Sequence, residues 1–201
     1  MGILYKKGLI STKNTKVEKV FNSLMGNQTF EQIPYNSPRE YINKYWNEFC
    51  KLPHPSNSLN GNMWECVINT LLYREGLLPF YRQAKVAFVP NVNFDILFYT
   101  PSFPINISLK TSLRERYKQA DLEAIALKYV HRKAKSFLLT LESEEAMKCK
   151  EKVESGDIIG LDGIIDCNTN EINELIGELH KMKDTFTESK TIEIVTGILI
   201  K

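Results

Sequence analysis

Two acidic residues and a lysine mark the stretch of this sequence best suited to chemistry. Asp95 lies at the start of the apolar run from Phe94 to Tyr99, and Lys110 closes the next run, which starts at Ile105. Glu123 follows within a helical pattern. A hairpin and the helix behind it would bring these side chains together. We therefore expect a Mg²⁺ site beside a phosphodiester, with Asp95 and Glu123 as metal ligands and Lys110 orienting or activating the attacking water.

A third carboxylate, Glu65, lies in a helical pattern further upstream. Its neighbours three and seven residues later are Ile68 and Leu72, so Glu65 falls at or near the buried side of that helix. A buried carboxylate is costly unless it is paired or bound to a metal. We therefore expect Glu65 to support the catalytic group as an additional ligand or as a residue that orients the ligands.

The densest polar cluster follows Lys110 directly and is expected to open a helix. Arginine can bind guanine O6 and N7 with two hydrogen bonds, and glutamate can accept from cytosine N4. Arg114, Glu115 and Arg116 are therefore candidates for reading G·C pairs, while Lys118 and Gln119 are candidates for phosphate contacts. The net charge of only +2 means that a nucleic-acid partner would have to be met by such a local basic patch.

Hydrophobic periodicity and turn residues predict the elements that must position these side chains. Helices are expected near residues 17–24, 38–51, 62–75, 113–132, 144–154 and 171–182, with a loop over 52–62. Strands are expected over 80–89, 94–99, 105–110 and 136–141, within 158–167, and over 191–200. This order predicts an α/β fold, a mixed β-sheet core flanked by helices on both faces.

The cysteine spacing and the apolar runs indicate the compartment in which we expect the protein. Four scattered cysteines (Cys50, Cys66, Cys149 and Cys167) show no zinc or redox spacing, so we expect reduced thiols in the core. There is no apparent signal peptide, and no apolar run reaches the length of a membrane span. We expect a cytoplasmic protein with no membrane partner.

The ordered set of candidate residues resembles the type II restriction endonucleases of the PD-(D/E)xK superfamily. The resemblance lies in Asp95, Ser108-Leu109-Lys110, Arg114-Glu115-Arg116 and Glu123. It is similar to the EcoRII/PspGI/NgoMIV group, in which the second acid has moved to the next helix as K-x12-E. The resemblance implies that Asp95 and Glu123 are the metal carboxylates and Lys110 the catalytic lysine. It also implies that Glu65 is the upstream helical glutamate and that Arg114 to Arg116 read a CC/GG portion of the target.

The resemblance covers roughly residues 60 to 135 and departs from the pattern at two positions. Phe94 stands in place of the proline of PD, and Ser108 stands where most members have Asp or Glu, which makes activity depend on Glu123. It implies a restriction-endonuclease-like fold. We expect a single endonuclease domain over 1–201, with an N-terminal helical part to about 60, a catalytic core to about 141 and a C-terminal α/β part beyond.

Three functions remain open at this point. The first is a homodimeric type II restriction endonuclease that uses Mg²⁺ to cut double-stranded DNA at a short palindromic site and leaves 5′-phosphate ends. The second is a repair or structure-specific nuclease with the same metal site. The third is a non-catalytic DNA-binding protein in which these acids are ordinary surface charges.

Overall fold

The computed structural model describes residues 2–11, 15–26, 28–53, 55–189 and 193–201. Within these ranges it contains α1 (Ile3–Lys6), α2 (Thr15–Leu24), α3 (Pro38–Cys50), α4 (Asn57–Arg74), β1 (Phe80–Val86), β2 (Phe94–Phe98), β3 (Ile105–Leu109), α5 (Arg116–Val130), β4 (Lys135–Thr140), α6 (Ser143–Glu154), β5 (Gly163–Asp166), α7 (Glu171–Met182), the 3-10 helix η2 (Lys183–Thr185) and β6 (Ile194–Ile200).

The strands form one mixed sheet in the order β5-β4-β3-β2-β1-β6. β1, β2 and β3 pair as an antiparallel meander, β4 and β5 continue in parallel with β3, and β6 pairs antiparallel with β1. The sheet therefore has the meander at its centre, while the last two strands of the chain, β5 and β6, form its opposite edges. The start of the strand expected over 191–200 lies outside the described residues.

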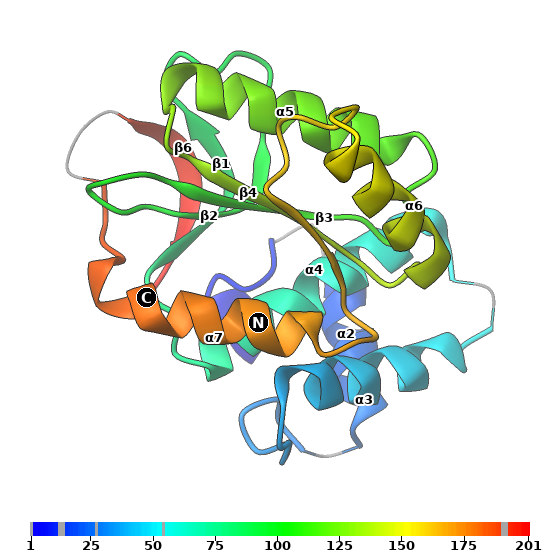
Figure 1. Ribbon diagram of the computed structural model, residues 1–201. Helices are drawn as coiled ribbons and strands as arrows, with labels where there is room; N and C mark the ends of the chain where they lie inside the picture. The colour runs from blue at the N-terminus through cyan, green and yellow to red at the C-terminus, as the bar shows by residue number, and fades with distance from the viewer. Residues whose placement is uncertain (1, 12–14, 27, 54, 190–192) are drawn as a thin grey trace.

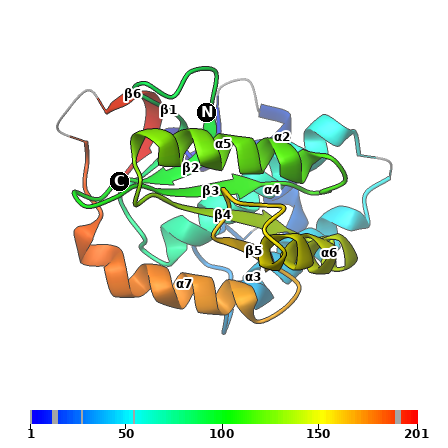
Figure 2. The ribbon, with the colours of Figure 1, turned by 45° about the horizontal axis from the view of Figure 1, so that its top comes forward.

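Helices cover both faces of the sheet, which confirms the predicted α/β architecture (Figures 1 and 2). On one face, α2, α3, α4 and α7 pack on a core that includes Ile96, Ile107 and Leu139 from three adjacent strands. On the other face, α5 contributes Leu127 to a cluster with Leu97. Because successive strand residues point to opposite faces, neighbouring positions of β2 serve the two layers in turn.

Two helices begin at different residues from those expected. α4 starts at Asn57, inside the expected loop over 52–62, because the Ser56 hydroxyl accepts a hydrogen bond from the Leu59 N–H and caps it. α5 starts at Arg116 rather than at Leu113. A turn therefore separates the end of β3 from α5.

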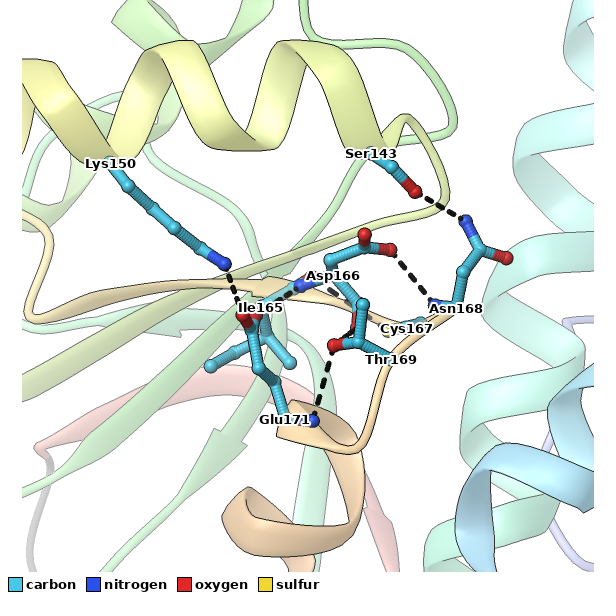
Figure 3. Close-up of polar contacts among 8 residues, drawn as sticks. All are labelled: Ser143, Lys150, Ile165, Asp166, Cys167, Asn168, Thr169 and Glu171. Carbon is cyan, nitrogen blue, oxygen red and sulfur yellow. Dashed lines mark hydrogen bonds and ion pairs between the residues drawn. The ribbon is translucent and has the colours of Figure 1, made fainter.

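The turn from β5 to α7 is closed by its own polar side chains (Figure 3). The carboxylate of Asp166 accepts from the backbone N–H of Asn168 at 2.9 Å, and the Asn168 amide donates to the Leu141 carbonyl. Glu171 accepts from the Asp166 N–H at 2.9 Å and pairs with Lys150 of α6. These contacts account for the burial of Asp166 and give this acidic group a structural role.

All four cysteines are free of disulfides, but one of them lies outside the core. Cys66, Cys149 and Cys167 are buried free cysteines, as expected, whereas Cys50 at the end of α3 is exposed. The expectation was wrong for Cys50 because the last residue of this helix faces away from its apolar stripe. In the part of the chain that the structure describes, no helix is both long and apolar enough to cross a membrane.

Candidate active site

Asp95 and Lys110 meet at one end of the β2–β3 hairpin. The Lys110 Nζ lies 3.6 Å from Asp95 Oδ2, and the same oxygen accepts a hydrogen bond from the Leu109 N–H at 2.9 Å. Only 7% of the Lys110 side chain and 17% of the Asp95 side chain are exposed. The hairpin therefore fixes a largely buried pair of opposite charges, with one oxygen of Asp95 bound to the neighbouring strand.

A bulge in β1 places a further polar side chain beside Asp95. Gln83 lies between Arg82 and Ala84, whose partners on β2, Ile96 and Phe94, flank Asp95, and the pairing with β6 shifts register between Arg82 and Lys85. Gln83 has φ +48°, in the left-handed region. This conformation costs a residue other than glycine about 1–3 kcal/mol, and such bulges re-aim a side chain.

Glu65 reaches the same place from α4. The Gln83 Nε2 lies 3.4 Å from Glu65 Oε2 and 3.4 Å from Asp95 Oδ1, so one amide group bridges carboxylates from two elements. Gln83 Oε1 accepts a hydrogen bond from Asn93 Nδ2 at 2.6 Å. Arg82 Nη2 lies 3.9 Å from Glu65 Oε2. The expectation that Glu65 faces the buried side agrees with its side chain being 25% exposed.

Glu123 lies on α5, two turns after the start of that helix. Its Oε1 accepts a hydrogen bond from Gln119 Nε2 at 2.7 Å. The charges of Lys110 and Asp95 both act on the pKa of Glu123, the lysine lowering it and the aspartate raising it. Glu123 thus lies within electrostatic reach of the hairpin pair while its hydrogen bond goes to its own helix.

The surroundings of the cluster disfavour the ionised form of two of its carboxyl groups. Burial, reinforced by the neighbouring charge of Asp95, raises the pKa of Glu65 to about 7, and Arg82 only partly offsets this. Burial also raises the pKa of Glu123 above its ordinary value. Carboxyl groups kept partly neutral by burial and by a like charge are stabilised in the ionised form when a cation binds between them.

The structure therefore joins Asp95 to Lys110 by direct contact and to Glu65 through Gln83, while Glu123 of α5 interacts with the hairpin pair only through its charge. Sequence reasoning missed Gln83 and Arg82. Both lie in an expected strand, but the bulge that turns Gln83 towards Asp95 leaves no mark in the hydrophobic pattern. Arg82 is almost fully buried, and a strand pattern alone does not show which charged residue is enclosed.

The donor set suits a hard divalent cation. Its atoms are carboxylate oxygens and a side-chain amide, which are the ligands typical of Mg²⁺ and Ca²⁺. Among the residues that the structure describes, no group of three or more His, Cys, Asp or Glu is placed to hold a metal ion. Mg²⁺ needs fewer, because it commonly uses one or two carboxylates and completes its shell with water and phosphate oxygens. The expected ligands Asp95 and Glu123 are compatible with this, with Glu65 beside Asp95.

The expected recognition residues lie where the turn after β3 enters α5. Arg114, Glu115 and Arg116 are exposed, and Arg114 has φ +31°. The backbone N–H groups of Leu113 and Arg114 donate to Glu145 Oε2 at 2.7 and 2.9 Å, which ties the turn to α6. The polar cluster does open a helix, as expected, but α5 begins at Arg116 with Glu115 as its N-cap, so Arg114 lies in the preceding turn.

The carboxylate of Glu115 is ion-paired with the exposed Lys118 one turn along the helix. Glu115 must therefore lose its ion pair with Lys118 before it can accept a hydrogen bond from a base. Gln119 is also engaged, since it donates to Glu123 rather than pointing away from the site. Arg114, by contrast, lines a small pocket together with Tyr117, Lys148 and Lys152. The basic character of this region extends onto α6.

Comparison with known proteins gives no relative from which a function could be inferred, so the proposal depends on the geometry of the site. No family model, no curated protein and no solved structure matches this chain.

Proposed function

We propose that this protein is a Mg²⁺-dependent deoxyribonuclease and, more narrowly, a type II restriction endonuclease. The observation that carries the proposal is the cluster of Asp95, Lys110 and Glu65 at one end of the central hairpin, with Glu123 of α5 within electrostatic reach. An acid and a lysine on adjacent strands, with further acids from the flanking helices, are the groups that phosphodiester hydrolysis requires.

Each residue of the site has a distinct proposed role. Asp95 and Glu123 would hold Mg²⁺, which supplies charge neutralisation at phosphorus and a more acidic bound water. Lys110, held 3.6 Å from Asp95, carries its positive charge into the site and orients the attacking water. Glu65 raises the negative charge of the site when it is ionised and thereby favours cation binding.

The DNA partner is supported by exposed basic side chains that follow Lys110 in the sequence and by lysines at the adjoining pocket. The exposed Arg114 and Arg116 follow Lys110 within a few residues, and Lys148 and Lys152 of α6 flank the adjoining pocket. We propose that these groups contact the backbone phosphates and base edges of a duplex. The narrower proposal, a homodimer that reads a palindrome containing CC/GG and leaves 5′-phosphate ends, rests on the resemblance to the restriction endonucleases.

Digestion of an unmethylated plasmid tests the proposal. Protein with Mg²⁺ should give discrete fragments with 5′-phosphate ends, and protein with EDTA should give none. Nicking or a preference for branched DNA would indicate a structure-specific nuclease instead. DNA binding without cleavage, unaffected by Asp95→Asn, would show that the protein binds DNA without hydrolysing it.

A further inference from the structure

We propose that β6 pairs antiparallel with β6 of a second copy of this chain, about a two-fold axis at Gly197, so that one sheet continues through a homodimer. This inference rests on the proposed function for the expectation of a homodimer, and it adds the surface that forms it. The occupant of the β6 edge is therefore the same strand of another copy.

The outer edge of β6 lacks the features that usually protect a strand from pairing. β6 pairs with β1 on one side, and no strand of the described residues pairs with the other side (Figure 1). Its seven residues, Ile-Val-Thr-Gly-Ile-Leu-Ile, include no charge and no proline, and Val195 is 60% exposed. Monomeric proteins usually place lysine, proline or a covering element at such an edge, because its unpaired N–H and C=O groups recruit another strand.

The opposite edge of the sheet carries that protection. β5 has only four residues, follows Asp162 and ends in Asp166. Asp162 is ion-paired with Lys128 and Lys135, so charged groups lie beside the start of this strand. Of the two edges, β6 is the one suited to the addition of a strand.

The sequence of β6 complements itself when one copy runs antiparallel to the other. With the axis at Gly197, Ile194 lies opposite Ile200 of the second copy, and Val195 lies opposite Leu199. Aliphatic pairs directly across two antiparallel strands stabilise a sheet. The glycine places no side chain at the axis, where the two backbones are symmetric neighbours.

Opposite charges meet at both ends of the strand in this register. Glu193 of one copy lies opposite Lys201 of the other. A hollow beside the end of β6 is lined in part by Lys6 and Lys201, so it presents positive charge towards the second copy's glutamate. Within its own chain Lys201 pairs with Glu188, but both side chains are exposed, and such a pair contributes little and is readily exchanged. The charges therefore favour the same register as the aliphatic pairs.

The axis also lies level with the candidate active site. Arg82 of β1 pairs with Ile96 on one side and with Ile198 on the other. Asp95 and Gly197, one residue earlier on each strand, therefore lie on nearly the same line across the sheet. Strands lie about 4.8 Å apart, so five spacings place the two Asp95 residues of the dimer about 24 Å apart on the same face of the sheet. A symmetric pair of sites is what cleavage of both DNA strands requires.

Reversal of the end charges tests the register. The mass of the full chain, 23.2 kDa for one copy, is followed by analytical ultracentrifugation over a series of concentrations. Wild type should dimerise, Glu193→Lys and Lys201→Glu should each weaken the dimer about tenfold, and the two changes together should restore it. The two positions lie at opposite ends of β6 in one chain, so restoration reports a contact between copies.

Two lysine substitutions test the location of the interface. Val195 on β6 and Leu122 on α5 are similarly exposed apolar residues, at 60% and 65%. Val195→Lys should weaken the dimer about tenfold or more, and Leu122→Lys should leave it unchanged, with circular dichroism used to check that both are folded. Dissociation by Leu122→Lys but not by Val195→Lys would place the interface on α5 and overturn the inference.

A wild type that is monomeric at every concentration, or a double reversal that stays as weak as the single ones, would also overturn the inference. Plasmid cleavage measured on the same samples separates it from the proposed function. A dimer that responds to these β6 substitutions but never cuts DNA would refute the nuclease and retain the interface. Wild-type protein that cuts DNA, with Val195→Lys fully dimeric, would refute only the interface.

Discussion

Replacing Glu65 with glutamine should stabilise the metal-free protein at alkaline pH. The glutamine keeps the shape of the protonated acid and removes a charge that burial and Asp95 disfavour. The pKa of Glu65 is raised from 4.5 to about 7. Because each tenfold change in proton affinity is worth about 1.4 kcal/mol, the full effect is about 3 kcal/mol of unfolding free energy.

The direction of the pH dependence follows from the raised pKa. The folded protein holds the Glu65 proton more tightly than the unfolded chain does, so this residue favours folding while it is protonated. That contribution is fully present below about pH 4.5, declines as the pH rises to about 7, and is absent above it. The gain in stability of Glu65→Gln over wild type should therefore be near zero at acidic pH and reach its maximum above neutral pH.

Urea unfolding in EDTA at acidic, neutral and alkaline pH measures this difference. Glu178→Gln serves as a control, because Glu178 is a well-exposed residue whose local ion pair with Lys181 lies on the outside of α7. If Glu65→Gln were destabilising at every pH, or equal to wild type above neutral pH, the argument that Glu65 carries a costly buried charge would be wrong.

The remaining predictions concern recognition, metal binding and folding. Arg114→Ala and Arg116→Ala should each cost about 1–3 kcal/mol of discrimination between the cognate duplex and one with a changed G·C pair, measured as a ratio of cleavage rates; unchanged ratios would reject their role in recognition. Mg²⁺ should raise the unfolding temperature of wild type and leave that of Asp95→Asn unchanged, and an equal rise in both would place the ion elsewhere. Ser56→Ala should lower the unfolding free energy by about 1 kcal/mol in urea, because it removes the α4 cap, and no loss would contradict that cap.

The layers of the fold could be predicted because their signals are local. Met63, Val67 and Leu71 mark a buried stripe on α4, and all three are almost completely enclosed. The start of α4 could not be predicted in the same way, because its asparagines and Gly61 are typical of a loop. The Ser56 side chain caps the helix and fixes where it begins. Helix ends depend on individual hydrogen bonds, and those are weaker signals than a repeating apolar face.

Only part of the site could be predicted from the sequence. A strand acid and a strand lysine on consecutive strands imply a shared hairpin, and Asp95 and Lys110 do meet there. Gln83 joins them at a register shift between β1 and β6, two strands far apart in the sequence, so no local pattern indicates it. The orientation of Glu123 was equally hidden, because Gln119 on the preceding turn holds its carboxylate in the described conformation.

The central claim is that Asp95, Lys110 and Glu123 act on one phosphodiester. Its most direct test is the single-turnover cleavage rate of duplex DNA in Mg²⁺ for wild type, Asp95→Asn, Lys110→Met and Glu123→Gln, with DNA binding measured in parallel and Glu178→Gln as control. We predict that each of the three substitutions lowers the cleavage rate by orders of magnitude and leaves DNA binding largely intact. Glu178→Gln should cleave at the wild-type rate. Cleavage by Asp95→Asn at the wild-type rate would contradict the claim.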